Sequence, residues 1–546
     1  MDRRLTEDAL DFAALLGGAA LFYLSRSWVV ALVGLALFVL ISWARLELAA
    51  LAVIVFVPYF THPKSIFGHH AFPPSEWLLF AVVGVAALAT ITSSLGLGGK
   101  RPEEATDHEH ISFREVLARY RFPRSPSWHR LFGSPFVTPG LLFLAVATLS
   151  TALASQRHLA ARDLLEVILE PLLLFVVLLL FTPEDENGRR RTFVFIGVAV
   201  VLTGLVPSLI AIGQLVTGQH LVVVNGAAYK RVPGPYPSPD NLGLLLDRTI
   251  PMTLALLLAA WTWHRRTSKG INHRDRKTAP GDSPVQPTVE DVYSPSIERE
   301  FDVPQLLVLA VSLVAMGIAL IATFVLGAWL GTSIAVVAIL LVRLKPGWWV
   351  VAGVAVILVL AVALGSTKAH SVTAGVRVNI WTSAIHMIRD HPILGIGMDN
   401  FQHYYAPRHG DGVGPHARPE SGRCNLGLGY MEPAASNEPC LSHPHNAVFD
   451  LWLSTGILGL LAFIWLQWVF WRIVWQRRRF LTIAPVLLGA GGAMLASLLH
   501  GLVDNVYFLV DLSLLMWLLF AIASLSQGTD DIVEHGPIPS PVVTSA

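Results

Sequence analysis

Three side chains in two polar segments of this chain are of types that act on phosphorylated or hydroxyl-bearing substrates. Arg231 lies in segment 217–240, and Arg377 and His445 lie in segment 366–446. A guanidinium group binds phosphate oxygens through paired hydrogen bonds and neutralises their charge without a metal ion. An unperturbed imidazole titrates near pH ~6.5 and can take a proton from a hydroxyl group, a step worth on the order of 10²–10⁴ in rate. The sequence therefore contains groups that could bind phosphate and activate a hydroxyl. Whether they form one site depends on the helices and loops that position them.

Segment 366–446 is the longest polar segment near these residues, and it holds eight of the twenty histidines and both cysteines. Apolar residues recur at helical spacing after Arg377, which predicts a helix over 377–390. One face of this helix is expected to carry Ile380, Trp381, Ala384, Ile385 and Ile388. A helix of this kind lies on a membrane surface or caps a bundle.

The composition excludes most classes of soluble protein. Charged residues make up 14% of the 546 residues, hydrophobic residues make up 53%, and the mean hydropathy is +0.57. A soluble domain has roughly 25% charged residues. The net charge of +1, without a sustained basic surface, argues against a nucleic-acid partner. We therefore predict an all-α polytopic membrane protein that is embedded in the lipid bilayer.

Fourteen apolar stretches approach the length of about 20 residues that crosses roughly 30 Å of hydrocarbon. Two of them are short, so we expect about twelve to fourteen transmembrane helices. With the N-terminus in the cytoplasm, 26 of the 39 Lys and Arg residues fall on the cytoplasmic side, as the positive-inside rule requires. Segments 217–240 and 366–446 then face outside. The stretches are 9–24, 28–42, 46–60, 77–97, 136–154, 164–182, 192–216, 241–263, 304–326, 329–342, 347–365, 447–471, 482–503 and 506–526.

Three regions follow from this pattern of spans and loops. Loops 98–135 and 265–303 are charged or proline-bearing cytoplasmic linkers, to which we assign no chemistry. The regions are N-terminal transmembrane helices over 1–190, a transmembrane core over 191–526 and a flexible tail over 527–546.

Several motifs of the core, taken in order, resemble those of the O-antigen ligase and polymerase superfamily. The first is Arg231-x-x-Gly-x-Tyr-x-x-Pro-x-Asn241 in the first outside segment. The others are Arg377 with Trp381, His391-Pro-x-x-Gly-x-Gly-x-x-x-Phe401, His445-Asn446, Gly456-x-x-Gly459 and His500-Gly-Leu-Val-Asp504-Asn505. The resemblance extends over residues 190 to 525, which makes this region the O-antigen-ligase-like core.

The resemblance implies a metal-independent, inverting glycosyltransferase of the bacterial inner membrane, without a cofactor. Its donor is a glycan on undecaprenyl diphosphate, a polyprenyl carrier, and its acceptor is a hydroxyl group on lipopolysaccharide core or on another glycan, lipid or protein. Arg231 and Arg377 are expected to bind the diphosphate, and His445 to activate the acceptor, on the extracytoplasmic side. The nearest alternative is a polysaccharide repeat-unit polymerase with the same fold. Alternatives of another class are a membrane transporter and a non-catalytic export scaffold.

Six further residues near these motifs are candidates for substrate binding. Asp450 lies one helical turn before Ser454, where the superfamily usually has an acid, and could substitute for it. Arg248 could add a third positive charge or pair with an acid such as Asp247 inside the bundle. The six candidates are Asn241, Arg248, Trp381, His443, Asn446 and Asp450.

The three main residues also have structural alternatives. Arg231 and Arg377 could contact lipid headgroups. His445 could simply precede a helix that its neighbour Asn446 caps.

Cysteine and histidine in segment 366–446 raise two further questions. Cys424 and Cys440 lie in an oxidising compartment on this topology, which favours a disulfide over two free thiols. The histidines match no known zinc motif, so we expect no metal site.

Overall fold

Helices account for nearly all the regular structure in the computed structural model of this protein. The described strands form two short antiparallel hairpins, β1 (Lys64–Ile66) with β2 (His70–Phe72) and β3 (Val222–Val223) with β4 (Lys230–Arg231). The structure describes residues 3–66, 70–95, 125–223, 230–274, 303–344, 368–405, 441–481 and 484–527.

The helices follow one another with short connections. The first half of the chain contains α1 (Arg3–Leu24), α2 (Trp28–Ala44), α3 (Leu46–Phe56), η1 (Val57–Tyr59), α4 (Pro74–Ser94), α6 (Trp128–Gly133), α7 (Val137–Leu153), α8 (Arg157–Asp163), η2 (Leu164–Leu169), α9 (Glu170–Phe181), α10 (Glu186–Thr217) and α11 (Pro239–Arg274). The second half contains α13 (Val303–Thr323), α14 (Leu326–Leu344), α16 (Lys368–Asp390), α17 (Phe401–Tyr405), α18 (Ala447–Gln476), α19 (Pro485–His500) and α20 (Val510–Leu525).

The helices confirm an all-α polytopic membrane protein. Among the described residues, seven helices are long and apolar enough to cross a membrane, and five more are apolar but shorter. Thirteen of the fourteen predicted stretches coincide with one helix or with two consecutive helical segments. The remaining stretch, 347–365, lies outside the described residues.

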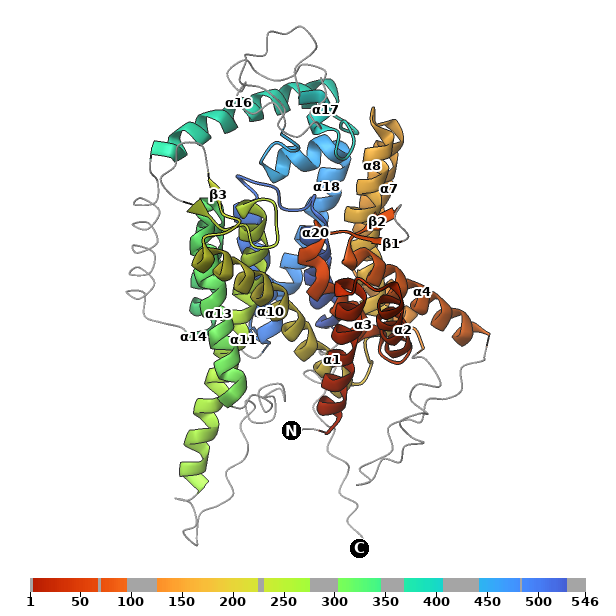
Figure 1. The fold of residues 1–546 in the computed structure, drawn as a ribbon, viewed down its shortest axis with the longest axis vertical. Coiled ribbons are helices and arrows are strands. Elements are labelled where there is room, and N and C mark those ends of the chain that lie inside the picture. Colours follow the sequence, from red (N-terminus) through yellow and green to blue (C-terminus); the bar gives the residue numbers. More distant parts are fainter. Residues whose placement is uncertain are drawn as a thin grey trace, which may run out of the picture.

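The bundle has two distinct ends (Figure 1). Most helices run roughly along one axis, whereas α16 lies across one end of the bundle with α17 beside it. The β3 strand lies near this same end, and α1 begins toward the opposite end. Segments 217–240 and 366–446 therefore contribute structure to the same end of the molecule, as the predicted topology requires.

α16 differs in two details from the predicted helix over 377–390. It begins at Lys368, nine residues before Arg377. Its buried face is rotated from the predicted one, because Ser383 and Met387 are fully buried while Ile385 is 38% exposed. The reason is that α16 packs against protein, in a small core shared with α17 and the first turns of α18. Its contacts thus fix the helix as a cap on the bundle.

Candidate functional site

The connection between α19 and α20, residues 501–509, is the point where four of the predicted site residues meet, Asn446, Arg377, Arg248 and His445. Its backbone carbonyl groups accept hydrogen bonds from side chains of α11, α16 and the residue before α18. Asn446 binds the carbonyl of Leu502, Arg377 that of Val503 and Arg248 that of Val506. Three elements that are distant in the sequence are thereby attached to one short loop.

His445 is paired with Asp504 of this connection. Its Nδ1 lies 3.0 Å from Oδ1 of Asp504, and the two side chains are 22% and 4% exposed. Because a carboxylate can only accept, Nδ1 of His445 carries the proton in this bond, and in the neutral form of the imidazole Nε2 then has the lone pair. The pair therefore has the arrangement of a histidine base that a buried acid orients.

The backbone of His445 is held in an uncommon conformation by its neighbours. Its φ of 50° lies in the left-handed region, which costs a residue with a side chain on the order of 1–3 kcal/mol. Asn446 begins α18 by accepting hydrogen bonds from the amides of Val448 and Phe449. The amide of His445 donates to Nδ1 of His443 at 3.3 Å. Asn446 is thus the expected helix cap, but His445 also has a side-chain partner that a cap would not need.

Asp504 stays ionised because positive partners outweigh its burial. Burial alone would raise the pKa of this carboxyl group. The hydrogen bond from His445, with the charge of this imidazole when it is protonated, outweighs it, so the pKa of Asp504 lies below its ordinary value. A charged carboxylate is the form that best stabilises a protonated His445.

A second histidine extends this pair into the bundle. Nε2 of His500 lies 3.9 Å from Oδ2 of Asp504, and its Nδ1 lies 2.6 Å from Oδ2 of Asp247. Thr332 donates to the other oxygen of Asp247 at 2.7 Å. His500 and Asp247 are 1% and 0% exposed. The interior pair thus lies beside one oxygen of Asp504, while the other oxygen is bonded to His445.

His443 lies against His445, with ring centroids 4.2 Å apart. Removal from water, together with the positive fields of His445 and Arg377, lowers the pKa of His443 to about 3. His443 is therefore neutral at ordinary pH, and its Nδ1 can accept the amide hydrogen bond of His445. His443, His445 and Asp504 each offer one atom within 4.8 Å of the others, so these three residues could also hold a metal ion.

Arg377 stands beside this cluster on α16. It donates a hydrogen bond from Nη1 to the carbonyl of Val503, next to Asp504. One turn later, Trp381 donates from Nε1 to the carbonyl of Pro444 at 3.1 Å. The two residues fasten α16 to both sides of the His445–Asp504 pair, which places a guanidinium group close to the imidazole.

Arg231 lies in β4 and is held by a different set of contacts. Its Nε donates to the carbonyl of Thr323 and its Nη2 to Asp240, both at 2.7 Å. Asp240 is close enough to His500 to interact with it electrostatically. Within the described part of the chain, no hydrogen bond joins Arg231 to Arg377 or to residues 501–509. The described contacts therefore do not bring the two arginines together.

The remaining candidates have mixed positions. Arg248 is buried and donates to two backbone carbonyls, those of Leu244 and Val506, while Asp247 binds His500. Arg248 thus holds the connection through these hydrogen bonds, with the charges of Asp247 and Asp511 nearby, as the alternative of an interior position beside an acid predicts. Asn241 lies half-buried in the first turn of α11. Cys424 and Cys440 lie outside the described residues.

Asp450 is buried in the first turn of α18. Its Oδ2 has no hydrogen-bond partner among the described residues. The group is available to a ligand that reaches the start of α18, which leaves its predicted role open.

Two glycine motifs join segments that position the site. Gly456 interrupts α18 with a φ of 69°, and a Cβ there would lie 1.9 Å from the carbonyl oxygen of Ile393. Gly395 also has a positive φ, and a Cβ there would lie 2.2 Å from the carbonyl oxygen of Leu453. Ile396 donates its amide to the same carbonyl at 2.7 Å. The turn after α16 thus docks into a break in α18, which fixes the two helices relative to each other.

The fold and the site define a multi-pass helical membrane protein with a histidine–carboxylate–arginine cluster at one end. Residues 311–420 match the model of a protein family described as O-antigen ligase. The matched segment contains Arg377 and Trp381 and ends before His445. No curated protein matches the chain. The chain therefore resembles the O-antigen ligase superfamily, as its motifs predicted.

Asp504 belongs to one of the sequence motifs, but its pairing with His445 could not be predicted from that motif. The interior pair of His500 and Asp247 was not predicted either. The available signal was the presence of three ionisable groups in or next to apolar stretches, where they are costly and usually functional. That signal identifies the groups without stating which of them touch.

Proposed function

We propose that this protein is a membrane glycosyltransferase that moves a glycan from an undecaprenyl-diphosphate carrier to an acceptor hydroxyl group. The observation that carries the proposal is the His445–Asp504 pair beside Arg377. In this arrangement His445 can act as the base for the acceptor hydroxyl, and Arg377 can neutralise the charge of the leaving diphosphate. The segment match to the O-antigen ligase family supports the same class of reaction.

In the proposed reaction His445 acts as the general base. Its Nε2 takes the proton of the acceptor hydroxyl while the acceptor oxygen bonds to the anomeric carbon of the donor. The bond from that carbon to the phosphate oxygen breaks, and its electron pair leaves with undecaprenyl diphosphate. Asp504 stabilises the imidazolium that forms and keeps the proton on Nδ1. His500 and Asp247 are positioning residues that act through Asp504.

The diphosphate gains negative charge as it leaves, and the arginines are proposed to neutralise it. Arg377 uses one nitrogen for the carbonyl of Val503, which leaves Nε and Nη2 for phosphate oxygens. Arg231 is proposed to bind the same diphosphate from the β3–β4 hairpin, with Nε and Nη2 engaged and Nη1 directed to the ligand. Donors placed before the charge develops stabilise a transition state without reorganisation. We place this site at the extracytoplasmic face of the bacterial inner membrane.

A ligase and a repeat-unit polymerase share this chemistry and differ in the acceptor. A ligase passes the glycan to lipopolysaccharide core or another cell-surface acceptor, whereas a polymerase passes it to another repeat unit. The size of the product distinguishes them, because a ligase adds one glycan to each acceptor and a polymerase produces a ladder.

The test is transfer by the purified protein in nanodiscs, with a radiolabelled undecaprenyl-diphosphate glycan and an envelope extract as acceptor. We expect label on the acceptor and release of undecaprenyl diphosphate in equal amounts. Arg377→Ala should abolish transfer, whereas Arg389→Ala, on the exposed end of the same helix, should preserve it. Equal transfer by both variants, or movement of label across the membrane without transfer, would contradict the proposal.

A further inference from the structure

The side chain of Gln214, in the last turn of α10, forms two hydrogen bonds with a single residue of segment 217–240. Its Nε2 donates to the carbonyl of Gly234 at 2.7 Å, and its Oε1 accepts from the amide of Gly234 at 2.9 Å. An amide side chain carries a donor and an acceptor side by side, so it can pair with the backbone as a neighbouring strand would. The Gln214–Gly234 pair thereby joins two points of the chain that are 20 positions apart.

The neighbouring polar side chains of α10 make a different kind of bond. The hydroxyl group of Ser208 donates to the carbonyl of Gly204, and that of Thr217 donates to the carbonyl of Gly213. Both bonds stay within the helix, one turn back, as serine and threonine commonly do. Gln214 lies between these two residues and instead bonds a segment outside the helix.

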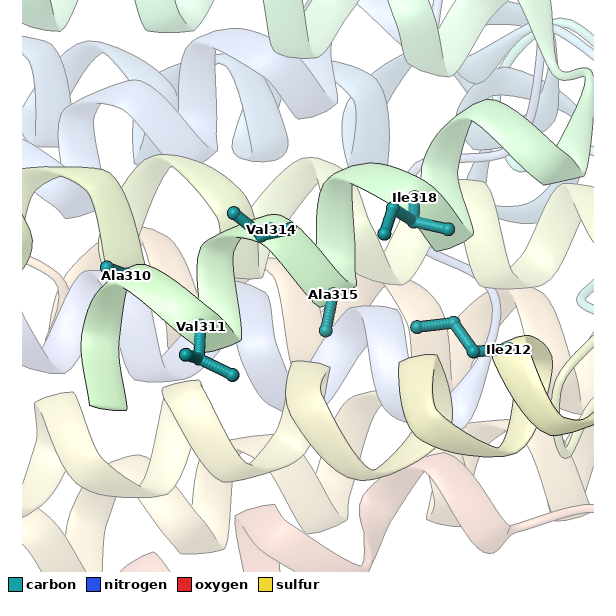
Figure 2. Close-up of a pocket in the computed structure, with 6 residues that line it drawn as sticks. All are labelled: Ile212, Ala310, Val311, Val314, Ala315 and Ile318. Carbon is teal, nitrogen blue, oxygen red and sulfur yellow. The ribbon is translucent and has the colours of Figure 1, made fainter. Parts of the chain in front are cut away.

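The surroundings of Gln214 on α10 are apolar. Leu215 and Val216, which follow it, are 45% and 81% exposed, as is typical of side chains that face lipid. Figure 2 shows that Ile212, which precedes it, faces aliphatic side chains of α13. A polar amide in such surroundings costs free energy unless its hydrogen bonds are made. The contact with Gly234 therefore supplies the physical reason for an amide at this position.

The pair with Gln214 holds one side of the short segment that carries Arg231. The other side is held by the end of α13, where Nε of Arg231 donates to the carbonyl of Thr323 at 2.7 Å and the amide of Val232 donates to the carbonyl of Ala322 at 3.1 Å. Gly234 follows directly and is attached to α10. The segment is thus fixed between the ends of two helices.

Gly234 is the point at which this segment could most easily change direction. Its φ is 62°, and a Cβ there would lie 3.3 Å from the carbonyl oxygen of Pro207 in α10. Glycine permits this conformation but also has more backbone freedom than any other residue. The two hydrogen bonds from Gln214 remove that freedom three residues after Arg231.

We propose that Gln214 is a positioning residue for Arg231 and acts through the backbone of Gly234. This inference rests on the proposed function, because Arg231 is one of the two groups proposed to bind the diphosphate. The side chain of Arg231 keeps its bonds to Thr323 and Asp240, and Gln214 sets the path of the backbone from which it extends. Gln214 lies outside all the motifs that resemble the O-antigen ligase superfamily.

The first experiment measures amide hydrogen exchange by mass spectrometry on the protein in nanodiscs, without any substrate. Gln214→Met keeps the approximate size of the side chain and removes both hydrogen bonds. Exchange in peptides that contain Gly234 should become at least about 5-fold faster, which corresponds to the loss of one hydrogen bond. Gln219→Met, at an exposed position just after α10, is the matched control and should exchange as the wild type does.

Peptides from α18 and α19 should exchange at the wild-type rate in both variants, which shows that the fold is kept. Unchanged exchange at Gly234 in Gln214→Met would overturn the proposal.

The second experiment measures the KM values for donor and acceptor in the nanodisc transfer assay. Gln214→Met should raise the KM for the undecaprenyl-diphosphate donor by about 5- to 30-fold, which corresponds to one or two neutral hydrogen bonds. The KM for the acceptor should not change. In an Arg231→Ala background, Gln214→Met should cause no further loss, because it acts through Arg231. A full additional loss in that background, or an equal effect of Gln219→Met, would overturn the positioning role.

The two experiments separate this inference from the proposed function. Faster exchange at Gly234 in the variant, without any transfer by the wild type, would support the role of Gln214 in holding the segment and contradict the transferase. Transfer by the wild type, with unchanged exchange in the variant, would support the transferase and contradict the role of Gln214.

Discussion

The variant Asp504→Asn tests how the base is oriented. Nδ1 of His445 lies 3.0 Å from Oδ1 of Asp504, whose side chain is only 4% exposed. The substitution keeps the size of the side chain and removes its charge. A hydrogen bond to a charged group contributes about 1.5–3 kcal/mol. At 1.36 kcal/mol for each factor of ten, single-turnover transfer should fall by about 10- to 150-fold.

The assay compares transfer by Asp504→Asn with transfer by Asp511→Asn. Asp511 is also a buried acid, but its partner is Tyr236 at 2.8 Å, so its variant should preserve the rate to within a few-fold. In a His445→Ala background, Asp504→Asn should cause no further loss, because the two residues act as one unit. A full additional loss in that background would refute the orienting role, as would a wild-type rate in the single variant.

Three further predictions concern Arg377, the break in α18 at Gly456 and the dependence of transfer on a metal ion. Arg377→Lys keeps the positive charge but loses the planar guanidinium group, which can form two parallel hydrogen bonds to a phosphate. We therefore expect transfer in the nanodisc assay to fall at least ten-fold. A wild-type rate would show that the charge alone suffices. Gly456→Ala should lower the melting temperature in detergent by several degrees, because its Cβ would lie 1.9 Å from the carbonyl oxygen of Ile393. Gly84→Ala, where a Cβ meets nothing within 4 Å, is the control, and equal melting temperatures would contradict the strain. EDTA should leave transfer unchanged, whereas a loss that zinc restores would assign a metal to the two histidines and the aspartate of the cluster.

The helices of this protein could be predicted from the sequence because each depends on local composition. A stretch such as 447–471 is apolar over most of its length, and α18 extends over it. A stretch of this length and composition is helical in a membrane without help from distant contacts. The helix after Arg377 was predicted for the same reason. Its start at Lys368 and its rotation toward Ser383 were not, since both depend on packing against α17 and α18.

The candidate site could be predicted only in its residue types. His445 and Asp504 are 59 positions apart in the sequence, and nothing in their spacing states that they touch. The left-handed backbone of His445 likewise depends on tertiary contacts of its neighbours. Glycine is needed at position 456 because the turn that contains Gly395 docks against the same break in α18. Motifs thus identified the groups, and the three-dimensional structure supplied their partners.

The proposed reaction depends most on His445, which we propose activates the acceptor hydroxyl in a glycan transfer. The most direct measurement is single-turnover transfer by wild type and His445→Ala in nanodiscs, with bound donor measured in the same samples. We expect unchanged donor binding and a chemical step at least about 100-fold slower in the variant. An unchanged rate per bound donor would contradict the claim and remove His445 from the reaction.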